Sequence, residues 1–257
     1  MTHALLCSAE GVNRFHPEIG FFRGAVNAYI IGRHVWQKET SAFFADPAHF
    51  RRLMRETAET WLDQVWDAVD RPRILCVKDP NLTPHFPTVA EMLPDALFVV
   101  VCRHPHDVVR SRQAVLEQMG HAVTPGDVTE VAREYLQYYS SALEHRYGGR
   151  MFAFRYEDLN KASLRDALAG FLNVPGFDTS AMWQVGGRHP AAVDSDPWRS
   201  PKYFRPLDLE RRLDPLPEPW RAIVDEICEP IMLKFRYLQP APAPQDVNPH
   251  RAGASAG

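Results

Sequence analysis

Hydrophobic positions along the chain follow two different spacings. In the stretch 47–69 they recur every three or four residues, at Phe50, Leu53, Met54, Ala58, Trp61, Leu62 and Val65. This spacing predicts a long amphipathic helix. Short continuous apolar runs occupy 73–78, 96–102 and 151–155. Such runs are typical of parallel strands that are buried on both faces.

Weaker helical patterns and helix-start signals fill the intervals between these runs. They predict helices at about 3–10, 27–36, 88–93, 105–119, 128–145, 164–172 and 219–235, with loops at 12–22, 80–87 and most of 174–215. Strands that alternate with helices indicate an α/β fold, and we expect a three-layer α/β/α sandwich around a mostly parallel sheet.

The length and composition suit one soluble globular domain. The chain has 257 residues, of which 45% are hydrophobic and 24% charged, which is enough for a single sizeable core. We assign this domain to residues 1–238. The stretch 239–257 is rich in proline, alanine and glycine, and we expect it to be a disordered tail.

Charge and hydropathy indicate which partners to expect and in which compartment the protein works. The formal net charge is -3 and the isoelectric point is near 6.4, so nucleic acid is not an expected partner and any anion site must be a local cluster. No apolar run is long enough for a membrane span, and the first residues do not resemble a signal peptide. We therefore expect a cytoplasmic protein.

The cysteine pattern gives no sign of a metal centre. The chain has four cysteines, Cys7, Cys76, Cys102 and Cys228. They form no CxxC pair and no Cys/His spacing of a zinc site, so we expect small buried thiols in a reducing compartment and no bound metal. His104 and His106 have no further ligands at suitable spacing, and we expect them on a surface loop.

Cationic residues follow two of the predicted strands. Lys78 ends the run 73–78, and Arg103 comes directly after 96–102. Ligands of open parallel sheets bind beyond the carboxyl ends of the strands, and the helix that begins near 105 favours an anion at its N-terminus. Ser111 lies eight residues after Arg103, on that helix. In the alternative interpretation, Arg103 and Ser111 belong to an ordinary helix-start cap and a solvated surface, and Lys78 pairs with Asp79 or Glu91.

The stretch 98–111 resembles the 3′-phosphate-binding segment of PAPS-dependent sulfotransferases, in particular the bacterial type. PAPS is 3′-phosphoadenosine 5′-phosphosulfate. In this family an arginine at a strand end and a serine eight residues later hold the 3′-phosphate, which implies donor-binding roles for Arg103 and Ser111. Lys78-Asp79-Pro80 resembles the family's Lys-x-Pro element. The resemblance implies that Lys78 stabilises the bridging oxygen as the sulfuryl group leaves.

Three more segments extend the resemblance. The stretch 155–159 is similar to the family's Tyr-Glu-Asp-Leu motif and implies that Tyr156 lies near the nucleotide. The stretch 199–204 is similar to the ending of many bacterial members, with Arg199 and Lys202 as candidates to close over the donor. The stretch 12–22 resembles a loop that carries a glutamate base, which implies this role for Glu18. Cytosolic members have a histidine base two residues after the lysine, but Pro80 stands at that position here. His85 is an alternative base.

One element of the family is not in the sequence. The chain contains neither the Arg-Ser-Gly-Thr-Thr-like loop that holds the 5′-phosphosulfate nor a Walker-type loop. Thr2-His-Ala-Leu-Leu resembles the helix that follows the family's loop, so the resemblance places the first strand and the loop just before Met1. Two explanations stay open: the recorded start is internal to the gene, or the protein lost half of its donor site.

The resemblance implies a function with one open alternative. The expected activity is transfer of a sulfuryl group from PAPS to a hydroxyl or amine of a small molecule, glycan or peptide, without a metal. The alternative is a non-catalytic or truncated protein of the same fold that binds a nucleotide or a partner. A nucleotide kinase is disfavoured because the Walker loop and the magnesium ligands are missing.

Overall fold

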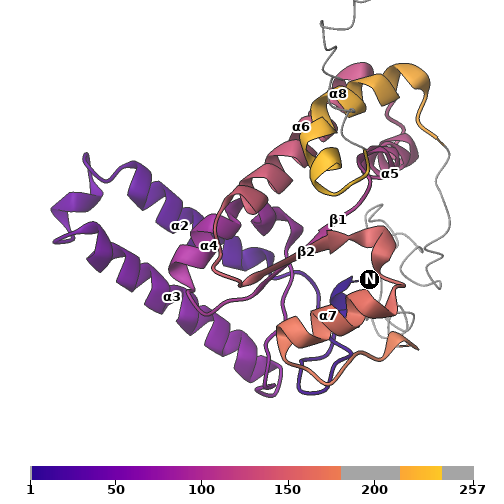
Figure 1. Cartoon of the computed structure of the whole chain (residues 1–257). Coiled ribbons are helices and arrows are strands. Elements are labelled where there is room, and N and C mark those ends of the chain that lie inside the picture. The colour runs from indigo at the N-terminus through magenta and orange to yellow at the C-terminus, as the bar shows by residue number, and fades with distance from the viewer. Residues whose placement is uncertain (1, 181–214, 239–257) are drawn as a thin grey trace, which may run out of the picture.

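A computed structural model describes residues 2–180 and 215–238 of the chain (Figure 1). Two expectations lie outside the described residues: the tail at 239–257, and the segment 199–204 with Arg199 and Lys202. Within the described ranges, no helix is long and apolar enough to cross a membrane.

Helices dominate the fold and surround a small sheet. The helices are α1 (Thr2–Leu6), α2 (Arg23–His34), α3 (Pro47–Ala68), α4 (Phe86–Met92), α5 (Pro105–Gln118), α6 (Pro125–Glu144), α7 (Ala162–Leu172) and α8 (Glu218–Lys234). Short 3₁₀ turns lie at η1 (Gly20–Phe22), η2 (Thr40–Ala42), η3 (Pro80–His85) and η4 (Tyr156–Asp158). Local chemistry sets several starts: α3 and α6 each begin with proline after an N-cap residue, Asp46 or Thr124, whose side chain accepts a backbone hydrogen bond.

The sheet of the described residues consists of two parallel strands. β1 (Phe98–Cys102) pairs with β2 (Met151–Arg155), in a register that sets Phe98 opposite Met151. On one face of β1, Phe98 packs against residues of α2 to α4, and Cys102 packs against α5, α6 and α8. On the other face, Val99 and Val101 pack against α1 and α7. Helices therefore cover both faces, which confirms the predicted three-layer α/β arrangement (Figure 1).

The prediction of a strand at 73–78 is wrong. This segment is extended, but it forms only an isolated parallel bridge between Ile74 and Val12. Its side chains still alternate between two cores: Cys76 packs with Val99 and Val101, and Val77 packs with the cluster that holds Phe98. The run is apolar because its side chains pack on both sides, as those of a strand do. Its backbone, however, bonds to the loop around Val12 and forms no continuous ladder with a strand.

Most predicted helices are present with shifted ends. The helix expected at 3–10 stops at Leu6 and continues as turns, and the helix expected at 27–36 begins earlier, at Arg23. The loop expected at 80–87 is a 3₁₀ turn that leads into α4. These differences concern the ends of elements, which the hydrophobic spacing alone does not fix.

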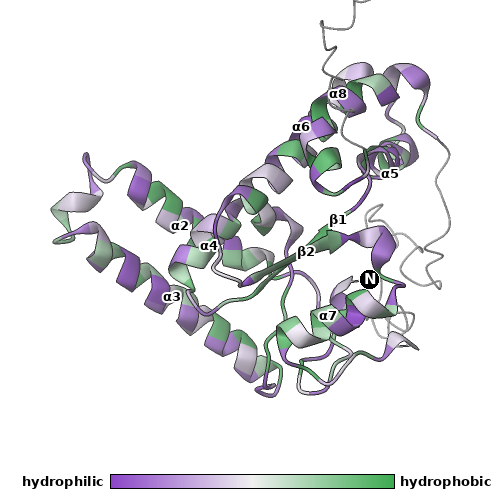
Figure 2. Cartoon of the chain, viewed as in Figure 1, coloured by the Kyte–Doolittle hydropathy of each residue, from purple (hydrophilic) through white to green (hydrophobic). Residues whose placement is uncertain are grey.

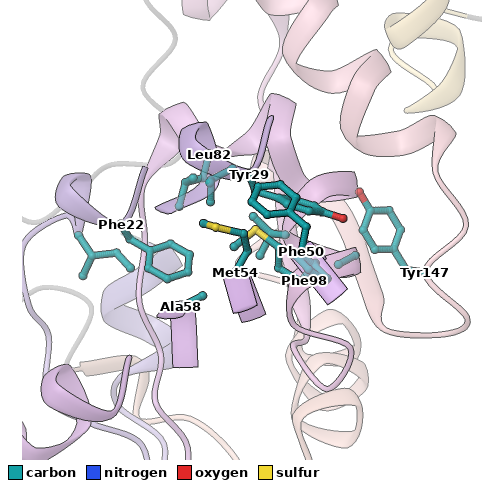
Figure 3. Close-up of a cluster of buried hydrophobic side chains, with 13 residues drawn as sticks. Phe22, Tyr29, Phe50, Met54, Ala58, Leu82, Phe98 and Tyr147 are labelled. Atoms are coloured by element: carbon teal, nitrogen blue, oxygen red, sulfur yellow. The ribbon is translucent and has the colours of Figure 1, made fainter. Parts of the chain in front are cut away.

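An aromatic core joins α2, α3 and α4 to the start of β1 (Figure 3). Phe50 of α3 lies 5.7 Å from Tyr29 of α2 between ring centroids, and Phe98 of β1 lies 5.0 Å from Tyr147. Figure 2 shows hydrophobic residues along β1, whereas α3 carries hydrophobic and hydrophilic residues in turn. The helices α2 and α3 therefore each pack an apolar face into the core beside the sheet.

Gly32 lets α2 and α3 approach closely. A Cβ atom at this position would overlap the Phe50 ring and lie only 2.7 Å from its Cε1 atom. The ring has little room to move, because Tyr29, Trp36 and Phe44 surround it. The side chain of Thr40 also donates a hydrogen bond to the Gly32 carbonyl oxygen, at 2.8 Å. Position 32 therefore requires glycine for packing.

Replacing Gly32 by alanine should lower the free energy of unfolding by about 1–3 kcal/mol, because the added methyl group overpacks the aromatic core. Chemical denaturation followed by tryptophan fluorescence measures this change. The matched control is Gly24→Ala on the same helix, where the new Cβ would lie 3.6 Å from Trp61, an ordinary contact. The control should be neutral or stabilising; equal losses in both variants would contradict the packing argument.

Candidate functional site

Two buried tyrosines of α6 fix the carboxyl end of β1. The Tyr139 hydroxyl donates to the Val101 carbonyl oxygen at 2.8 Å, and the Tyr135 hydroxyl donates to the Arg103 carbonyl oxygen at 2.9 Å. Burial raises the pKa of both phenols, so both keep the protons that they donate. The tyrosines therefore hold the backbone at the strand end from one side of the sheet. The Arg103 side chain extends from this fixed backbone.

The Arg103 side chain lies between a carboxylate and an aromatic ring. Its Nε and Nη2 atoms donate to Asp107 Oδ2 at 3.3 and 3.2 Å, and its guanidinium lies 5.3 Å from the centre of the Tyr156 ring. About a third of the side chain stays exposed, at 30%. The structure thus brings together two of the predicted site residues, Arg103 and Tyr156. It also leaves the cation open to a ligand.

Ser111 lies on the same face of α5 as Asp107. The two residues are four positions apart in a continuous helix, so Ser111 follows Asp107 one turn further along. Asp107 contacts Arg103, so the face of α5 that carries Asp107 and Ser111 lies next to the predicted phosphate-binding arginine. Ser111 is partly exposed.

Glu157 connects three segments around the strand end. Its Oε1 atom accepts from the His104 backbone N–H at 3.0 Å, and its Oε2 atom lies 2.6 Å from the Tyr237 hydroxyl. The same hydroxyl lies 3.0 Å from the Cys102 carbonyl oxygen. Sequence reasoning singled out the neighbouring Tyr156 but missed Glu157 and Tyr237. The acidic residue of the Tyr-Glu-Asp-Leu motif was the available signal for Glu157.

Ion pairs also fix the end of β2. Arg155 forms a bidentate contact with Asp158, with both distances at 2.9 Å, and Lys161 lies 2.9 Å from the same carboxylate. The hydrogen bond from Arg155, supported by Lys161, holds the pKa of Asp158 below its usual value. The Arg155 guanidinium also lies 5.6 Å from the centre of the Tyr237 ring. The two strand ends thus share one framework of charged and aromatic groups.

Lys78 and Glu18 form a second pair. Lys78 Nζ lies 3.2 Å from Glu18 Oε1, and the two side chains are 35% and 47% exposed. The backbone explains the contact: the Ile19 N–H donates to the Lys78 carbonyl oxygen at 3.1 Å, so the loop carrying Glu18 runs beside the extended segment. The structure therefore brings together the residues predicted as base and as leaving-group cation. It assigns neither role.

The alternative partners of Lys78 are engaged elsewhere. Asp79 is buried, and its Oδ2 atom lies 2.8 Å from Arg23 Nε. Glu91 pairs with Arg33. The simple pairing of Lys78 with Asp79 or Glu91 is therefore not found. His85, the alternative base, ends η3.

The predicted common rim for Lys78 and Arg103 stays a prediction. Cys76 and Val101, near the ends of the two segments, pack in one hydrophobic cluster, so the segments share a layer. In the described structure each cation has its own counter-ion, Glu18 for Lys78 and Asp107 for Arg103.

The expectation that His104 and His106 lie on a surface loop is wrong. His104 is the N-cap of α5, and its Nδ1 atom accepts from the His106 backbone N–H at 3.3 Å. His106 lies in the first turn, with Nε2 2.7 Å from Asp225 of α8. Burial, together with the nearby His106, lowers the pKa of His104. A neutral imidazole is also what the cap requires, because Nδ1 accepts only without its proton.

Comparisons with known proteins agree with this geometry. The sequence model of the sulfotransferase family matches residues 12–173, which is more than half of the chain. Among solved structures, the sulfotransferase domain from the curacin biosynthetic pathway is similar, with a TM-score of 0.57. The match has 16% identity and covers 89% of this chain and 91% of that domain, so it shows likeness of fold alone. No curated protein gives a significant match.

The His104 cap makes stability depend on pH. The folded-state pKa lies below the ordinary value of 6.5, so the unfolded chain binds the proton more readily. Stability from the neutral cap is therefore complete above pH 6.5 and falls as the pH drops from 6.5 through the folded-state pKa. Denaturation midpoints measured across this window, with an NMR titration of the imidazole, test the sign.

Two variants separate the cap from other titrating groups. His104→Asn keeps a side-chain acceptor at the N-cap but does not titrate, so it should flatten this part of the pH profile. His34→Asn, at an exposed position at the end of α2, should leave the wild-type profile in place. A profile unchanged by His104→Asn would contradict the assignment.

Proposed function

Because the chain belongs to the sulfotransferase family, we propose that it transfers a sulfuryl group from PAPS to a hydroxyl or amine acceptor. One observation carries the proposal: Arg103, whose side chain is 30% exposed, follows a buried parallel strand at the start of a helix and contacts the Tyr156 ring. This arrangement offers a phosphate a fixed cation and the positive end of the α5 helix dipole. Both favour the binding of a phosphorylated nucleotide donor.

In this proposal Arg103 and Ser111 hold the 3′-phosphate of the donor. Asp107 occupies two of the donor atoms of Arg103, Nε and Nη2, through one carboxylate oxygen. A guanidinium has five N–H groups, so others remain for phosphate oxygens. In the proposal the nucleotide passes beside the Tyr156 ring, which contacts the Arg103 guanidinium. Lys78 and Glu18 then belong to the transfer chemistry.

The transfer follows an in-line path. The acceptor oxygen or nitrogen bonds to sulfur while the bond from sulfur to the bridging phosphate oxygen breaks, which releases PAP (3′-phosphoadenosine 5′-phosphate). Glu18 takes the proton that the acceptor loses. Lys78 stabilises the negative charge on the leaving oxygen. The 3.2 Å contact between Lys78 and Glu18 supports this division, because a substrate that separates the pair would meet both groups.

PAP binding tests the phosphate site directly. Arg103→Ala should weaken PAP binding about 10- to 150-fold, because it removes a charge-assisted contact of about 1.5–3 kcal/mol. Isothermal titration calorimetry measures the dissociation constant. The matched control is Arg55→Ala on α3, which removes another arginine from an i,i+4 ion pair, with Glu59. The control should bind PAP like wild type; equal affinity in Arg103→Ala would refute the site.

Turnover tests the proposed base. Glu18→Gln should lower sulfuryl transfer about 10²- to 10⁴-fold, because the amide accepts no proton at neutral pH. Affinity for PAP should stay near that of wild type. The assay follows radiolabelled PAPS against a panel of hydroxyl and amine acceptors, with Glu10→Gln, an exposed carboxylate in a nearby turn, as the control. Unchanged turnover in Glu18→Gln would remove Glu18 from this role.

The alternative is a protein of this fold that binds a nucleotide or a partner without catalysis. The two functions differ in whether a loop holds the 5′-phosphosulfate of the donor, because transfer requires that group to be fixed. The reading frame upstream of Met1 discriminates between the two. An in-frame Arg-Ser-Gly-Thr-like loop after an apolar strand would support the enzyme, and the turnover assay would then use the longer chain. PAP binding without turnover in such a chain would support the binding function.

A further inference from the structure

His3, Cys7 and Cys76 form a compact cluster beneath the segment that carries Lys78. His3 and Cys7 are four positions apart, at α1 and the turn that follows it, and Cys76 comes from the extended segment. One ring nitrogen of His3 and the two sulfur atoms all lie within 4.8 Å of one another. The fold thus joins residues whose spacing in the sequence gives no zinc motif.

Buried polar groups surround this cluster. His3 is only 6% exposed; its Nε2 atom lies 3.2 Å from the Cys76 carbonyl oxygen, and its Nδ1 atom is buried without a hydrogen-bond partner. Asn13, which is 3% exposed, accepts from the Cys76 backbone N–H and places its amide nitrogen 3.9 Å from Cys7 Sγ. A buried polar atom without a partner is costly, so the free Nδ1 atom needs an explanation.

We propose that His3, Cys7 and Cys76 bind a zinc ion. Two thiolates and an imidazole are the ligands that zinc takes in proteins, and a carbonyl oxygen that accepts from the other ring nitrogen is the usual support for a ligand histidine. When Nε2 donates to the Cys76 carbonyl oxygen, Nδ1 carries the lone pair for the metal. The fourth position of the tetrahedron is left to a ligand from solvent, since both cysteines are only partly buried.

The spacing of the ligand atoms suits this ion. Zinc–sulfur bonds of about 2.3 Å in a tetrahedron place two sulfur atoms about 3.8 Å apart. The ligand atoms lie within 4.8 Å of one another, so the two sulfur atoms need to approach by about 1 Å at most. A Cys7–Cys76 disulfide is the competing explanation for two close thiols. It leaves the Nδ1 atom of His3 without a partner, whereas a zinc ion uses all three groups.

Zinc binding by the full, reduced chain tests the proposal. Competition with a chromogenic chelator should give about one zinc ion per chain, and Cys7→Ala or Cys76→Ala should weaken binding by at least about 100-fold. Cys228→Ala, which removes a buried thiol far from the cluster in the core of α6 and α8, is the matched control. It should bind zinc like wild type. Equal zinc affinity in all three variants would overturn the proposal.

A second measurement needs no variant and does not depend on catalysis. Cobalt(II) added to the reduced wild-type chain should produce the near-ultraviolet absorption of thiolate–cobalt charge transfer, and zinc should abolish it. Absence of this band would overturn the site. So would a fully reduced chain that takes up no zinc and forms a Cys7–Cys76 disulfide when the reductant is removed. Neither result bears on PAP binding, so failure here is distinguishable from failure of the proposed sulfotransfer.

Discussion

A strand that is buried on both faces can expose functional side chains only at its end. For β1, this limits where the molecule can carry a functional site. The alternate side chains of β1 fill two cores, and the tyrosines of α6 bind the carbonyl oxygens of Val101, in the strand, and of Arg103, just beyond it. Arg103 is the first residue beyond this burial. Its guanidinium therefore leaves a backbone that has little freedom, at the point where α5 begins. The position of the cation follows from packing, and the candidate site depends on it.

The charged residues in this region form ion pairs, and this pairing affects how strongly an anion can bind there. Arg103 has Asp107, and Lys78 has Glu18, so neither cation attracts a ligand with its full charge. A phosphate must compete with carboxylates that are already in place. This competition favours a ligand that carries several negative groups over a single small anion. It also agrees with a chain of slightly negative net charge, -3.

The sequence predicted what depends on local pattern and missed what depends on long-range contact. The buried runs at β1 and β2 and the long helix α3 could be found because periodicity reports burial directly. The run 73–78 misled for the same reason: it is buried on both sides, but hydrogen bonding with a distant partner decides whether a strand forms. Glu157 and Tyr237 meet across 80 positions, and only the fold brings them together.

The extended segment before Lys78 shows why such distant contacts matter for function. Cys76 faces the core beside α1, Val77 faces the aromatic core, and Lys78 reaches Glu18. Three consecutive residues thus belong to three different environments, and the segment has no ladder that would hold it in place independently. Its position depends on Asn13 and on the α1 side of the core. Whatever tightens the contact between α1 and Cys76 therefore also limits the movement of the Lys78 backbone, because only one residue separates them.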